Sequence, residues 1–106
     1  MTTSRVISSD RVRLALVREG VPVETVDAFL RWKRSNQDIW IAFERIALRA
    51  IANGEKRWGA KGIAEIIRYQ VRVIQKRSTF KMNNNYPAYL ARAFIVKYPH
   101  HAKFFE

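Results

Sequence analysis

Residues 36–54 read NQDIWIAFERIALRAIANG, and this stretch decides the fold. Its apolar side chains recur at intervals of three and four, the period of an α-helix with one buried face. Asp38 lies in the first turn, as in a capping box, and Asn53–Gly54 is a typical helix end. The stretch therefore predicts a helix over about residues 37–53. The apolar positions that recur along it are Trp40, Phe43, Ala47, Ala50 and Ile51.

Helical patterns continue on both sides of this segment. Gly20 is typical of the residue that follows a helix, and Pro22 introduces a second helical pattern. Pro87 suits the first turn of a last helix, with one of the preceding residues as its cap. These further helices are predicted at about residues 10–19, 23–34, 60–75 and 87–97.

The stretch around residues 69–82 fits two structures. Tyr69, Val71 and Val73 alternate with polar residues, a strand pattern that would allow a small β-hairpin with residues 79–82. No Gly or Pro interrupts the helical pattern before residue 75. We therefore favour a helix to about residue 75 and keep the hairpin as the alternative.

These patterns predict an all-α protein, a compact single domain of about five short helices. The 106 residues suffice for one domain, and a hydrophobic content of 48% suffices for its core. We expect residues 1–20 to form an N-terminal extension with a short helix, and residues 21–106 to form a single helical domain. The three tryptophans, Trp32, Trp40 and Trp58, are expected to fill the core.

The net charge of +11 is concentrated in the second half of the chain. Residues 1–55 contain nine Lys or Arg against seven Asp or Glu, whereas residues 56–106 contain eleven against two. Such an excess of positive charge raises the energy of a compact state through repulsion, and it suits a negatively charged partner. A polyphosphate backbone fits best, because each neutralised phosphate releases counterions. A merely solvated cationic face is the plainer interpretation.

Several functional classes are not expected. The chain has no cysteine, and its two histidines are the adjacent His100 and His101, so we predict no metal site and no cofactor. Glu44 and Glu65 are each explained by a neighbouring arginine, so no acid–base pair or enzyme activity is expected. No apolar run approaches a membrane span, and the first residues lack the apolar core of a signal peptide. These features predict a protein of the cytoplasm with no membrane contact.

Residues 80–94, FKMNNNYPAYLARAF, are the most distinctive stretch. One asparagine suffices to cap a helix, so three in succession exceed that need. Asparagine amides suit base edges and phosphate oxygens, and Tyr86, Tyr89 and Arg92 share one helical face. The alternative is a structural turn with half-buried tyrosines.

Together with the surrounding cations, these residues form the predicted nucleic-acid site. Lys61, Arg68 and Arg72 share a helix face, and Arg77 and Lys81 flank the loop before the asparagines. The gap between the last two predicted helices is too long for a helix-turn-helix motif. The full set is Lys56, Arg57, Lys61, Arg68, Arg72, Arg77, Lys81, Asn83, Asn84, Asn85, Tyr86, Tyr89 and Arg92.

Several segments resemble small, mostly uncharacterised proteins of phages and prophages. They are Ile39–Trp40 with Phe43, WGAKGIAEIIRY (58–69), FKMNNNY (80–86), YLARAF (89–94), KYP (97–99) and FFE (104–106), within about residues 25–106. The resemblance implies a phage-related origin and carries over no activity. The sequence thus predicts a non-enzymatic nucleic-acid-binding protein, DNA or RNA. The alternative is a phage inhibitor or accessory protein that binds a host nucleic-acid-processing protein.

Overall fold

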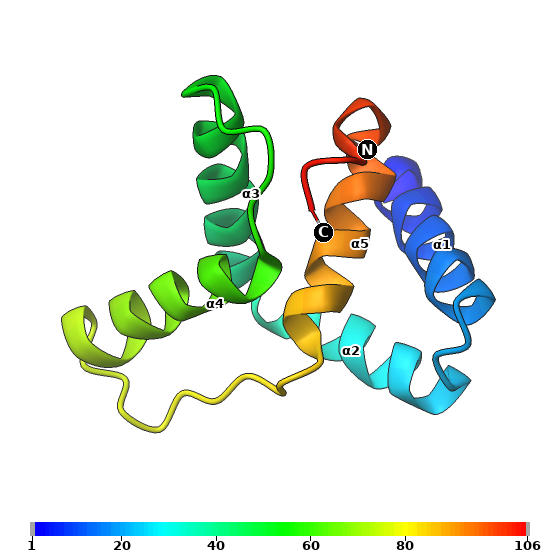
Figure 1. Ribbon diagram of the computed structural model, residues 1–106. Coiled ribbons are helices and arrows are strands. Elements are labelled where there is room, and N and C mark those ends of the chain that lie inside the picture. The colour runs from blue at the N-terminus through cyan, green and yellow to red at the C-terminus, as the bar shows by residue number, and fades with distance from the viewer. Residues whose placement is uncertain (1, 106) are drawn as a thin grey trace.

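The computed structural model describes residues 2–105, with side chains from residue 9 onward. These residues form five α-helices, a π-helical segment and a 3-10 turn, and they contain no β-strand. Helix α5 lies in the middle, with α1 packed on one side and α4 on the other (Figure 1). The all-α prediction is confirmed. The elements are α1 (Thr2–Arg18), α2 (Val23–Ser35), α3 (Gln37–Ala52), α4 (Ala60–Tyr69), η1 (Gln70–Ile74), α5 (Tyr86–Lys97) and η2 (Pro99–His101).

Helix α1 is longer than the short helix expected at residues 10–19, because it begins at Thr2. No Gly or Pro occurs between residues 2 and 18, so nothing in the sequence stops the helix earlier. Val12 and Leu16 of α1 are buried in the common core. The segment expected as an N-terminal extension therefore packs onto the domain through α1.

Two glycines end α1 and α3 in the same way. Gly20 has a φ of 91°, and its N–H donates to Val17 O (3.0 Å), while the next N–H, of Val21, donates to Leu16 O (3.1 Å). Gly54 has a φ of 92° and follows α3 with the equivalent pair of bonds. This is the Schellman arrangement, which glycine favours because it lacks a Cβ. Both predicted helix ends are confirmed.

Residues 69–82 form no hairpin, and the helix favoured for this stretch is present. Helix α4 continues into the π-helical segment η1, where Gln75 N–H donates to Gln70 O at 2.9 Å. Val71 is buried on the same side as Ile67, whereas Tyr69 and Val73 are exposed. The helical period prevails because Ile67 and Val71, four residues apart, both reach the core.

The core draws on every helix and on the connecting segments. Its fully buried large side chains include Phe29 of α2, Phe43 of α3 and Phe94 of α5. Phe80 and Met82 anchor the extended segment between η1 and α5, shown in yellow in Figure 1. The radius of gyration is 13.7 Å, near the roughly 13 Å typical of a compact domain of this length.

The C-terminal residues dock against the loop before α4. Trp58 N–H donates to Phe104 O at 3.0 Å, and Trp58 and Phe105 form an isolated parallel bridge. The ring of Phe105 lies 5.6 Å from that of Phe43, and Phe104 is buried. The expectation that Trp58 fills the core is wrong: the residue is 38% exposed, and its indole packs over Gly62 at the start of α4.

Candidate nucleic-acid interface

Ion pairs remove part of the charge of the second half. Three of the five pairs among the described residues join a cation of residues 56–106 to an acid of residues 1–55. They are Arg77–Asp38 (3.3 Å), Arg92–Glu19 (2.6 Å) and Lys97–Glu44 (2.5 Å). Five predicted site cations are exposed and form no ion pair with any described residue. These are Lys56, Arg57, Lys61, Arg72 and Lys81.

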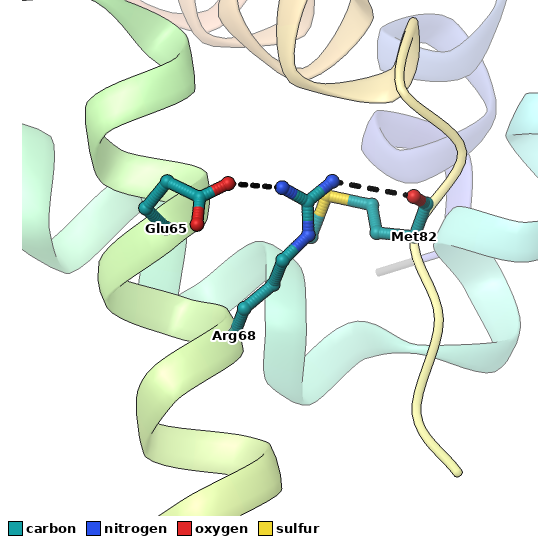
Figure 2. Close-up of polar contacts among 3 residues, drawn as sticks. All are labelled: Glu65, Arg68 and Met82. Atoms are coloured by element: carbon teal, nitrogen blue, oxygen red, sulfur yellow. Dashed lines mark hydrogen bonds and ion pairs between the residues drawn. The ribbon is translucent and has the colours of Figure 1, made fainter. Parts of the chain in front are cut away.

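Arg68 connects α4 to the extended segment before α5. One guanidinium nitrogen is ion-paired with Glu65 on the preceding turn, and the other donates to Met82 O at 3.3 Å (Figure 2). The Arg68 side chain is 26% exposed, so it lies largely beneath the surface. Its main role in the fold is to hold the segment around residue 82 alongside α4.

In the segment that Arg68 holds, successive side chains point alternately into the core and into solvent. Phe80 and Met82 are buried, whereas Lys81 and Asn83 are exposed. An extended chain points successive side chains to opposite sides. The two apolar anchors therefore force Lys81 and Asn83 outward beside Arg68.

The three asparagines differ in what they do within the fold. The Oδ1 atom of Asn83 accepts from Asn85 N–H at 2.9 Å, and Tyr86 N–H donates to Asn83 O at 3.0 Å, which together close the turn. Asn85 occupies the position before α5, but its side chain makes no capping bond. The side chains of Asn84 and Asn85 have no hydrogen bond among the described residues, and both are exposed. Two of the three amides are thus available to a ligand.

The tyrosines of α5 pack mainly within the protein. The Tyr86 ring lies 4.9 Å from the Trp32 ring and 5.2 Å from that of Phe29, and the Tyr89 ring lies 5.4 Å from Phe29. Both tyrosines are half-buried. Arg92, on the same face, pairs with Glu19 after α1. This face of α5 is turned toward α1 and α2. The two tyrosines therefore match the alternative interpretation, in which they are half-buried and support the fold.

The fold brings one part of the predicted site together. Lys61, Arg68 and Arg72 are spaced by seven and four residues along α4 and η1, which places them on one face. The Arg68 bond adds Lys81 and Asn83 beside that face. We call these five residues the basic surface.

The other predicted residues lie apart from these five or adjoin them only in sequence. Asn84 and Asn85 continue the chain from Asn83, and Lys56 and Arg57 precede α4. Arg77 pairs with Asp38, and its guanidinium lies 5.7 Å from the Phe80 ring. Arg77 therefore contributes to holding the segment after η1.

A polar cluster between α3 and α5 was not expected from the sequence. Glu44 accepts hydrogen bonds through one oxygen from Lys97 Nζ (2.5 Å) and Tyr98 OH (2.8 Å), and its side chain is only 16% exposed. The expected pairing of Glu44 with neighbouring Arg45 is wrong, because Glu44 pairs with Lys97, which lies 53 residues farther along the chain. No local pattern indicates this pairing.

The same cluster raises two pKa values, and burial nearby lowers a third. The hydrogen bond to Glu44 raises the pKa of Lys97, and burial together with that carboxylate raises the pKa of Tyr98. Burial lowers the pKa of Lys33, whose amine lies 4.5 Å from the Trp40 ring centroid. Glu44 opposes the last shift only in part. The cluster joins α3 and α5 and is distinct from the basic surface.

Other potential sites are few within the described part of the chain. No group of three or more His, Cys, Asp or Glu is placed to hold a metal ion among residues 2–105. No described helix is long and apolar enough to cross a membrane. A depression of about 290 Å³ opens between α1 and α2, and the Arg13–Asp27 ion pair contributes to its lining. It shares no residue with the basic surface.

Comparison with protein-family models, with curated proteins and with solved structures finds no match. The resemblance to small phage proteins therefore stays a prediction.

Proposed function

We propose that this protein binds nucleic acid through the basic surface and acts as a stoichiometric, non-enzymatic binding protein. One observation supports this most: Lys61, Arg72 and Lys81 are exposed and form no ion pair with described residues, although acids elsewhere pair with Arg77, Arg92 and Lys97. Cations that form no ion pair within the protein suit a phosphate backbone.

The charged members of the basic surface, and the two asparagines that follow Asn83 in the chain, have chemical roles in this proposal. Lys61, Arg72 and Lys81 would contact phosphates, and Arg68 would position the segment that carries Lys81. The amides of Asn84 and Asn85 would donate and accept hydrogen bonds at base edges or phosphate oxygens. Phosphate contacts give affinity, and amide contacts add discrimination between bases.

Salt dependence tests the proposal. Fluorescence anisotropy of labelled single- and double-stranded DNA and RNA is measured over a series of salt concentrations. Three phosphate contacts predict a slope of log Kobs against log salt of about −2 to −3. Absence of binding at low salt to all four nucleic acids contradicts the proposal.

One observation favours the alternative of a protein partner. Val73 and Ile74 in η1 are 57% and 64% exposed, and aliphatic side chains gain little from phosphates. In this alternative, η1 docks on a nucleic-acid-processing protein of a bacterial host. A pull-down after nuclease treatment tests this alternative, with the wild-type chain compared against the double variant Val73→Ser with Ile74→Ser. A protein partner should remain bound to the wild-type chain after the nuclease has removed nucleic acid. The same partner should be lost from the double variant.

A further inference from the structure

Helix α4 carries apolar residues on the side that faces away from the core. Ile63 and Ile67 define the buried side. The outward side carries a second apolar stripe, formed by residues at intervals of four and three: Gly62, Ile66 and Tyr69. The stripe runs along the side next to the face that carries Lys61 and Arg72; on the helical wheel Tyr69 lies nearest to that face and Ile66 farthest from it.

An aromatic ring lies at each end of this stripe. The Trp58 indole covers Gly62, where an added Cβ would lie 3.0 Å from Trp58 Nε1. Tyr69 lies two turns farther along, and its side chain is 59% exposed. Seven residues of helix separate Gly62 from Tyr69, or about 10 Å at a rise of about 1.5 Å per residue. That length accommodates about three stacked bases at about 3.4 Å each.

These two rings differ from the other tryptophans and tyrosines of the described chain. Trp32, Trp40, Tyr86, Tyr89 and Tyr98 each pack against another aromatic ring. Trp58 and Tyr69 have no aromatic neighbour among the described residues, and both are exposed. Exposed rings beside a cationic face are the two elements from which proteins build sites for single strands.

We propose that Trp58 and Tyr69 stack against unpaired bases, so that the ligand class of the basic surface is single-stranded nucleic acid. This inference rests on the proposed function and specifies its ligand. The phosphates of the strand would follow Lys61 and Arg72, while the bases turn toward the stripe. A duplex keeps its bases stacked on one another and offers no free base face to either ring.

The choice of variants at Tyr69 separates stacking from other contacts. Tyr69→Phe keeps the aromatic face, whereas Tyr69→Leu keeps an apolar side chain without one. A protein partner or a general apolar contact tolerates leucine, but a base requires the ring. Leu14→Ala on α1 is the matched control, because Leu14 is an exposed apolar residue on a different helix.

The experiment measures the affinity of each variant for a single-stranded oligonucleotide and for a blunt-ended duplex of two complementary strands with the same total number of nucleotides. Thermal melting confirms that each variant is folded. We expect Tyr69→Leu to lose about 5- to 150-fold in single-strand affinity. Tyr69→Phe and Leu14→Ala should stay within about twofold of wild type, and duplex affinity should not change.

The outcomes distinguish this inference from the function on which it rests. If both nucleic acids bind with salt-dependent affinity and Tyr69→Leu lowers neither, or lowers both equally, stacking is refuted while nucleic-acid binding stands. If Tyr69→Phe loses as much as Tyr69→Leu, the aromatic ring is not the recognising group. If neither nucleic acid binds at low salt, the proposed function is refuted as well.

Discussion

Substitution of the three asparagines separates the fold of the turn from its function, because only Asn83 has a visible structural role. Its Oδ1 atom accepts the Asn85 N–H at 2.9 Å, at an exposed position. A net contribution of about 1 kcal/mol is typical of such a bond. For a chain of this length the unfolding entropy is about 0.22 kcal/mol/K, so Asn83→Ala should lower Tm by about 4–5 °C.

Asn84→Ala and Asn85→Ala should behave differently. Neither side chain is bonded to a described residue, so each change should stay within about 0.5 kcal/mol, or about 2 °C in Tm. If these amides contact bases or phosphates, each loss should cost about 1–3 kcal/mol of binding, or about 5- to 150-fold in Kd. Melting by circular dichroism and binding by anisotropy are measured on the same preparations.

Asn83→Asp is the matched variant, since it keeps the acceptor oxygen of the turn and replaces the amide with a negative charge. It should melt like wild type and bind more weakly. The reasoning fails if Asn84→Ala and Asn85→Ala both bind as wild type while melting is unchanged. It also fails if Asn83→Ala leaves Tm unchanged, because the turn would then not depend on Asn83 Oδ1.

Three further predictions follow from the fold. Arg68→Gln loses the bonds to Glu65 and Met82 O, so chemical denaturation should show that the protein is about 1–2 kcal/mol less stable. The exposed control Arg72→Gln should change the stability by under about 0.5 kcal/mol, and equal losses would contradict the role of Arg68 in holding the segment around residue 82. Lys76 has a φ of 58°, a left-handed backbone conformation that costs a residue with a Cβ about 1 kcal/mol, so Lys76→Gly should raise Tm. Lys76→Ala keeps the Cβ, and a gain of the same size in that variant would refute backbone strain as the cause. Lys97 and Tyr98 have raised pKa values, so their protonated forms favour the fold; this stabilisation is complete below their ordinary pKa values of 10.5 and 10.0 and is lost as pH rises through the higher folded values. The lowered pKa of Lys33 acts in the opposite direction, because its charged form opposes the fold, and this cost is gone once the pH exceeds the ordinary value of 10.5. Tm should therefore fall above pH 10.0, and Tyr98→Phe should make that fall shallower; an unchanged pH profile in the variant would exclude Tyr98 as a source.

The parts of the fold that the sequence predicts are those set by local signals. Gly20 and Gly54 end their helices because a left-handed backbone strongly favours glycine, a property that the residue type itself reveals. The periodic apolar residues between 37 and 53 likewise indicate a helix without reference to the remainder of the chain. In contrast, the start of α1 at Thr2 lacks a strong local signal, and its position was not predicted.

The parts that the sequence does not predict depend on distant contacts. The Glu44–Lys97 pair spans 53 residues, and its partners become neighbours only after α3 and α5 pack. For the same reason, Tyr86 could be placed on a helical face but not against Trp32. Trp58 is exposed, and its backbone pairs with residues near the C-terminus, a contact that no local pattern indicates.

The candidate site also has one part that local signals predict and one part that depends on distant contacts. The shared face of Lys61, Arg68 and Arg72 follows from spacing alone, and the helix preserves it. The bond from Arg68 to Met82 O is a tertiary contact, so the sequence could not distinguish Arg68, which holds the segment, from Lys61 and Arg72, which are exposed. A binding test should therefore leave Arg68 intact.

Charge reversal of Lys61→Glu with Arg72→Glu tests the central claim most directly. Both side chains are exposed, without ion pairs to described residues, so the double variant should fold. The control is Arg11→Glu with Arg31→Glu on α1 and α2, which makes the same change in net charge on two other exposed residues. If the basic surface binds nucleic acid, the first variant should lose most of its affinity and flatten the salt slope by about 2, while the control loses little. Equal losses in the two variants would show that net charge alone drives binding and would contradict a localised interface.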